Sequence, residues 1–172
     1  MIFYSGFSLK DDVSFFEHLI DKSDYSISGF SYGSMMAFDL AYSKLKQAQR
    51  VDRVQLFSPL FFQQYDEKFK KLQLFGYKKD SKTYIENFIK QSFYPLKGGV
   101  VSHDVHTYDQ LRELLYFVWD EKKLKEICDS GVIIEVYVGS KDAIVDHEAV
   151  VSFFKNYADV TIFTRANHFL QQ

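Results

Sequence analysis

The chain has 172 residues, of which 47% are hydrophobic and 18% aromatic, and its formal charge is −2. A chain of this length and composition can bury enough surface to fold as one domain without disulfides or metals, which excludes a disordered protein. The charge excludes the broad basic field with which nucleic-acid-binding domains contact phosphates, so we expect no nucleic acid as a partner. We also expect a monomer.

The N-terminal residues predict a strand, a loop and a helix. Residues 2–4 are apolar and aromatic and lead into Gly6, a pattern typical of a buried strand that ends in a loop. Residues 8–22 carry apolar side chains at helical spacing, with Ser8 or Asp11 available as an N-cap. We therefore expect the second segment to be an α-helix.

The next segment predicts a second strand-to-helix unit with a sharp turn. Residues 25–28 have strand character, and residues 34–45 are rich in small residues and good helix formers. Only the five residues "GFSYG" (29–33) lie between them, so the chain must turn sharply there. The unit is therefore expected to be a strand, a glycine-rich turn and a helix.

The remaining strands lie farther along the chain. Segments 51–60, which has two Val residues among other apolar ones, and 131–142, which is rich in Val and Ile, are predicted strands. A last strand is predicted at 160–164 after a helix near 146–157. Strands that alternate with helices favour right-handed crossovers and a parallel sheet. We expect an α/β fold of about five parallel strands with helices on both faces and ligands at the strand carboxyl ends.

Residues 61–130 separate the third predicted strand from the fourth. The segment is mostly helical in pattern, has no convincing strand and is too long for one ordinary crossover. We expect a helical cap or lid inserted over the carboxyl edge of the sheet within a single domain of residues 1–172. Such insertions commonly shape substrate pockets.

A Gly-x-Ser-x-Gly motif occupies the predicted sharp turn, with Ser31 between Gly29 and Gly33. In this setting the motif is typical of a nucleophile elbow, in which the glycines allow neighbouring backbone to approach the serine. The alternative is that Ser31 is only a turn residue. The partner residues have to decide between the two.

The acid and the base of a catalytic triad should follow later strands, in the chain order Ser, Asp, His. Asp142 directly follows "VIIEVYVGSK" (residues 132–141), and His168 follows the last strand. Asp142 has an alternative role as a helix N-cap or in an Asx-turn, and Asp146 is a rival acid. The other histidines, which lack a preceding strand or lie in a predicted helix, are better suited to solvated or capping roles: His18, His103, His106 and His147.

The chemistry explains why these residue types are required. A serine hydroxyl becomes a strong nucleophile when an imidazole takes its proton and a buried carboxylate orients that imidazole. Ser31, His168 and Asp142 fill these roles. The oxyanion of the intermediate needs two backbone N–H groups, for which Tyr32 and Phe7 are the candidates.

The segments "FYSGF", "GFSYGS", "GSKDAIVD" and "ANHF", in this order, resemble the α/β-hydrolase superfamily over nearly the whole chain. In its small size the chain resembles the pimeloyl-acyl-carrier-protein methyl ester esterases of the BioV and BioH type. The resemblance implies a cytoplasmic serine carboxylesterase of biotin synthesis that needs no cofactor. Ser5-Gly6 stands where the family usually has His-Gly, and the N-terminal strands of larger hydrolases are absent.

The predicted lid is basic, with eight lysines against four acidic residues between positions 66 and 97. Acyl carrier proteins are acidic, so a basic lid would steer such a partner to the active-site entrance. The candidate partner-binding residues are Lys70, Lys71, Lys78 and Lys79. The alternative is a solvated helical face.

Two further function hypotheses remain open. A general carboxylesterase or an acyl thioesterase would use the same triad, and a non-catalytic hydrolase-like binding module would use none of it. The chain begins with strand-like sequence, has a single cysteine and contains no apolar run of about 18 residues. These features predict a cytoplasmic protein without disulfides or contact with a membrane.

Overall fold

The computed structural model describes residues 1–103 and 107–172 and is built on a five-stranded sheet in the order β1-β3-β4-β6-β7. All four strand pairs are parallel. The predicted α/β class and strand number are therefore confirmed, and the observed bounds differ by a few residues from those expected. The strands are β1 (Ile2–Tyr4), β3 (Ser26–Phe30), β4 (Arg53–Phe57), β6 (Ile133–Gly139) and β7 (Asp159–Phe163).

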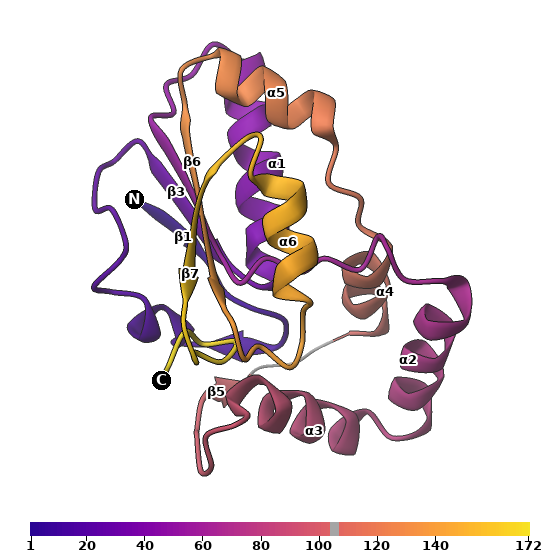
Figure 1. The fold of residues 1–172 in the computed structure, drawn as a ribbon. Helices are drawn as coiled ribbons and strands as arrows, with labels where there is room; N and C mark the ends of the chain where they lie inside the picture. The colour runs from indigo at the N-terminus through magenta and orange to yellow at the C-terminus, as the bar shows by residue number, and fades with distance from the viewer. Residues whose placement is uncertain (104–106) are drawn as a thin grey trace.

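One face of the sheet is covered by α1 (Tyr32–Lys46), α5 (Glu121–Asp129) and α6 (His147–Phe154), as Figure 1 shows. Their buried side chains join those of β3, β4 and β6 in one large apolar core. In α1, the buried Phe38 and Ala41 lie three residues apart on the face that packs on the sheet. Burial of this apolar face, more than helix propensity, stabilises α1.

The opposite face of the sheet carries a short helix. The prediction of an α-helix over residues 8–22 was wrong. Only a 3-10 helix forms there, η1 (Asp12–Phe15), preceded by Asp11 in the left-handed region at φ 59°. A continuous α-helix is interrupted because Ser8 (φ 64°) and Asp11 (φ 59°) lie in the left-handed region and Leu9 and Lys10 between them pair as a strand. The Asp12 carboxylate turns inward and accepts the Gly6 N–H at 2.8 Å. Aromatic packing replaces helix packing on this face, where the ring of Phe16 lies 4.8 Å from that of Phe57.

The segment 61–130 contains α2 (Glu67–Lys79), α3 (Ser81–Phe93) and α4 (Tyr108–Tyr116) before α5. Figure 1 shows α2, α3 and α4 grouped at one end of the sheet, whereas α5 lies beside α1. A strand that was not predicted, β5 (Ser102–His103), pairs antiparallel with β2 (Leu9–Lys10). This pairing ties the segment to the loop after β1.

Candidate active site

Ser31 lies in the turn between β3 and α1 and has φ 56° and ψ −115°, a strained conformation for a residue with a side chain. Its N–H donates to the Phe57 carbonyl at 2.8 Å. A Cβ at Gly29 would lie 2.1 Å from the Gly33 oxygen, and one at Gly33 would lie 2.0 Å from the Tyr4 oxygen. Both glycines of the motif are therefore required by close backbone contact.

This contact makes a stability prediction. Gly33→Ala should lower the free energy of unfolding by about 3 kcal/mol or more, since the new methyl group must displace the backbone of β1. Gly76→Ala is the control, because its Cβ would meet Tyr84 only at 3.6 Å, and a helix interior gains about 1 kcal/mol from this change. Urea unfolding measures both. Equal stability of the two variants would contradict the close packing at Gly33.

A chain of hydrogen bonds links Ser31 to two residues that are distant in sequence. His168 Nε2 lies 3.0 Å from Ser31 Oγ, and His168 Nδ1 lies 2.6 Å from Asp142 Oδ2. The side chains are nearly fully buried, with 1% of His168 and none of Asp142 exposed. The structure thus brings together the three residues expected at 31, 142 and 168, in the expected order.

The two candidate acids have different environments. Asp142 uses Oδ2 toward His168, while its Oδ1 accepts the N–H groups of Ile144 at 2.7 Å and Val145 at 3.1 Å. Asp146 is exposed and caps α6, where it accepts N–H groups of the first turn. Asp142 is therefore both the partner of His168 and the residue that shapes its own loop.

The loop that carries His168 is fixed by residues that sequence reasoning missed. Ser58 Oγ donates to the His168 carbonyl at 2.7 Å. The buried Asn167 accepts the Phe169 N–H through Oδ1 and donates through Nδ2 to the Phe93 carbonyl, both at 3.0 Å. Asn at 167 is a turn former next to a candidate base, which is the one sequence signal that could have identified it.

The other histidines lie elsewhere. His18 and His103 are exposed, and His147 is the first residue of α6. His106 lies outside the described residues. Of the histidines that the structure describes, His168 is the one that contacts Ser31.

The two candidate oxyanion residues, Phe7 and Tyr32, contact each other through their aromatic rings. Tyr32 begins α1 directly after Ser31, and the buried Phe7 places its ring centre 6.4 Å from that of Tyr32 and 6.0 Å from that of Phe88. The Tyr32 hydroxyl donates to Glu113 at 2.7 Å, and burial together with this carboxylate raises the pKa of Tyr32. The loop after β1 therefore lies beside the turn that carries Ser31.

The four candidate partner-binding lysines do not share one environment. Lys70 is buried, and its ammonium lies 5.0 Å from the ring centre of Tyr116 in α4. The Lys78 ammonium lies 4.4 Å from the ring centre of Tyr108 in the same helix. Lys71 and Lys79 are exposed. Two of the four lysines thus pack against α4 through cation–π contacts.

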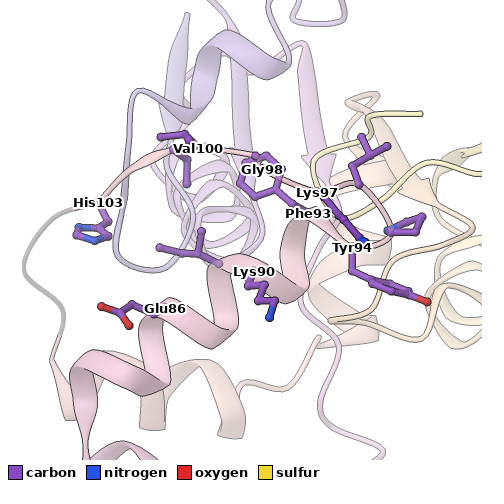
Figure 2. Close-up of a pocket in the computed structure, with 13 residues that line it drawn as sticks. Glu86, Lys90, Phe93, Tyr94, Lys97, Gly98, Val100 and His103 are labelled. Atoms are coloured by element: carbon purple, nitrogen blue, oxygen red, sulfur yellow. The ribbon is translucent and has the colours of Figure 1, made fainter.

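Among the cavities formed by the described residues, two border α3. One of about 210 Å³ lies between α2, α3 and α4 and reaches Ala143 and Ile144, next to Asp142. The other, of about 820 Å³, lies between α3 and the loop that follows it, with Glu86 and His103 at one end and Tyr94 at the other (Figure 2). The smaller cavity is the one that borders the loop of the acid.

The part of the chain that the structure describes contains neither a metal-binding cluster nor a membrane-spanning helix. Within residues 1–103 and 107–172, no group of three or more His, Cys, Asp or Glu side chains is arranged to bind a metal ion. In the same ranges, no helix has both the length and the apolar character needed to cross a bilayer.

No protein-family model and no curated protein matches the sequence, whereas many solved structures match the fold. BioG from Haemophilus influenzae superposes with a TM-score of 0.57 at 11% identity, over 98% of this chain and 87% of that one. Carboxylesterase CesB from Bacillus subtilis gives 0.53 at 18% identity, over 95% and 62%. A bromoperoxidase from Bacillus anthracis gives 0.64 at 14% identity, over 84% and 60%.

The chain thus spans less than two thirds of the length of several proteins that it resembles. At these identities the comparison concerns the fold, and the matching proteins share the parallel sheet described above. The fold expected from the four sequence segments is confirmed: this chain has the α/β-hydrolase fold.

Proposed function

We propose that this protein is a serine carboxylesterase in which Ser31 is the nucleophile, His168 the general base and Asp142 the residue that orients the imidazole. One observation carries the proposal: the unbroken hydrogen-bond chain from Ser31 Oγ through His168 to Asp142, with lengths of 3.0 and 2.6 Å. The strained φ of 56° at Ser31 supports it, because strain of this kind is concentrated at functional sites.

The reaction would proceed in two halves. Ser31 Oγ attacks the ester carbonyl carbon while His168 Nε2 takes its proton, and the negative oxygen is stabilised by the N–H groups of Phe7 and Tyr32. The carbon–oxygen bond to the alcohol then breaks, and the alcohol leaves with the proton from His168. A water molecule attacks the acyl-enzyme by the same route, which releases the acid and restores Ser31.

Two observations support our choice of substrate class: the cavity near Asp142 and the sequence resemblance. The cavity of about 210 Å³ is lined largely by apolar and aromatic side chains and suits a medium-length acyl chain. The resemblance to pimeloyl-acyl-carrier-protein methyl ester esterases makes that ester of biotin synthesis our leading substrate. A general carboxylesterase or acyl thioesterase is the alternative, because the same triad cleaves both bonds.

Turnover on a defined panel tests the substrate. The panel contains pimeloyl-carrier methyl ester, a free short methyl ester and an acyl thioester, with Ser31→Ala as the blank. The proposal expects the highest kcat/KM on the carrier-bound ester. A preference for the thioester or for the free ester would replace it with one of the alternatives, and no turnover on any would favour a non-catalytic binding module.

The exposed face of α2 is our candidate surface for an acidic carrier protein. It has large apolar side chains flanked by lysines, with Leu72 at 58% and Phe75 at 66% exposure. Along α2, Leu72 follows Lys68 by four residues, Phe75 follows Leu72 by three and Lys79 follows Phe75 by four, while Lys71 follows Lys68 by three, so the five side chains share one face. We call this set the α2 stripe: Lys68, Lys71, Leu72, Phe75 and Lys79.

Charge reversal in the α2 stripe should separate the two kinds of ester. Lys71→Glu with Lys79→Glu should lower kcat/KM for the carrier-bound ester by about 10-fold at low salt, because steering by rim charges is lost. Hydrolysis of a free ester should stay unchanged. Lys122→Glu with Lys125→Glu in α5, away from α2 in Figure 1, is the control. Equal losses on both esters would indicate damage to the fold, and no loss would leave α2 as a solvated face.

A further inference from the structure

A carboxylate outside the hydrogen-bond chain is buried beneath the loop after β1. Asp12 is 0% exposed, and its Oδ2 accepts the Gly6 N–H at 2.8 Å. Within the part of the chain that the structure describes, its Oδ1 has no hydrogen-bond partner. Burying a carboxyl group costs free energy unless hydrogen bonds or an ion pair compensate for the lost water. One oxygen of Asp12 has no such partner among the described residues, so its burial needs a physical explanation.

Burial and the contacts of Asp12 act on its pKa in opposite directions. Desolvation raises the pKa of Asp12, and the Ser5 hydroxyl and the Gly6 N–H oppose that rise. Ser5 and Gly6 belong to the loop after β1, and the backbone N–H of Asp12 itself opposes the rise as well. The side chain of Asp12 therefore interacts with this loop and with its own backbone.

Asp12 and Leu9 together fix the peptide groups of Gly6. The Gly6 N–H donates to Asp12, and the Gly6 carbonyl accepts the Leu9 N–H at 3.1 Å. With its donor and its acceptor both used, Gly6 has a defined orientation, and so has the peptide that joins it to Phe7. The direction of the Phe7 N–H is set by that peptide plane.

The same loop lies directly against the backbone of the nucleophile turn. A Cβ at Gly33 would lie 2.0 Å from the Tyr4 oxygen and 2.6 Å from the Ser5 oxygen, which leaves no space between the two segments. A displacement of Gly6 therefore changes the position of the Phe7 N–H relative to Ser31. A misplacement of about 1 Å at a reacting centre can cost about 10²-fold in rate.

We propose that Asp12 is a positioning residue for the oxyanion hole: by accepting the Gly6 N–H, it aims the Phe7 N–H at the oxygen that becomes negative on the Ser31-bound intermediate. Asp12 itself does not touch the substrate. The inference rests on the proposed esterase function and adds a residue to it. The hydrogen-bond acceptor is what matters, so an amide at position 12 can replace the carboxylate.

Three variants test this inference with p-nitrophenyl butyrate as the substrate. Asp12→Leu removes the acceptor and should lower kcat by about 10²-fold while KM stays within about 3-fold, because the interaction lost acts in the transition state. Asp12→Asn keeps an acceptor oxygen and should retain kcat within about 3-fold of the parent. Asp11→Asn is the matched control, since Asp11 is exposed and its side chain makes no cap contact.

A second readout does not depend on turnover. The Gly6 amide proton should exchange slowly in the parent and in Asp12→Asn, and rapidly in Asp12→Leu. If Asp12→Leu does not fold, Asp12→Ala takes its place with the same expectations. An active parent with unchanged kcat in the Leu variant, equal losses in the Leu and Asn variants, or a loss confined to KM would overturn the inference. An inactive parent would instead overturn the esterase function, whatever the exchange of Gly6 shows.

Discussion

Ser31→Ala lowers the rate of ester hydrolysis by about 10⁴-fold or more, because the nucleophile and its base act as one unit and loss of either removes the covalent route. The substitution removes one oxygen, and the contacts of Gly29 and Gly33 that hold the turn are unchanged. The free energy of unfolding should therefore change by no more than about 1 kcal/mol. Initial rates on a free ester and urea unfolding measure the two quantities.

Ser43→Ala is the matched control, since Ser43 lies exposed on the same helix, far along α1 from the turn. It should keep the full rate. If Ser31→Ala kept more than a tenth of the parent rate while folded, another residue would have to be the nucleophile, and the hydrogen bond to His168 would be structural only.

Asp142→Asn lowers kcat by about 10⁴-fold, as expected when an amide holds the imidazole in the wrong tautomer. The amide oxygen can still accept the N–H groups that Oδ1 accepts now, from Ile144 and Val145, so the loop should keep its shape. The loss should therefore be in kcat, with thermal unfolding close to that of the parent.

Asp146→Asn provides the comparison. Asp146 is the N-cap of α6, a position that Asn occupies equally well, and its carboxylate is exposed. Its rate should stay within about 2-fold of the parent, as is usual for surface changes. The opposite pattern, with a severe loss at 146 and little at 142, would reassign the acid and leave the nucleophile as it is.

The sheet and the hydrogen-bonded trio could be predicted because both depend on local patterns. Short apolar runs mark β4 and β6, the second of them rich in Val and Ile, and their alternation with helices predicts parallel strands. Gly29, Ser31 and Gly33 form a motif whose meaning is set by the strand before it and the helix after it. The positions of Asp142 and His168 follow once the strands are known.

The features that sequence reasoning missed depend on contacts between distant segments. Residues 8–22 have helical spacing, but the left-handed backbone of Ser8 and Asp11 and the pairing of Leu9–Lys10 with β5 interrupt a helix there. The strand β5 exists only through its pairing with β2, and two residues are too short to produce a pattern. Lys70 is buried against α4, where charge alone predicts a solvated side chain.

The most direct test of the central claim is mass spectrometry of the protein after treatment with a fluorophosphonate, which reacts with an activated serine. The account predicts a single adduct, located on Ser31, that does not form in Ser31→Ala and forms far more slowly in His168→Ala. Absence of an adduct on the folded parent protein, or an adduct on a different residue, would contradict the assignment of Ser31 as the nucleophile activated by His168.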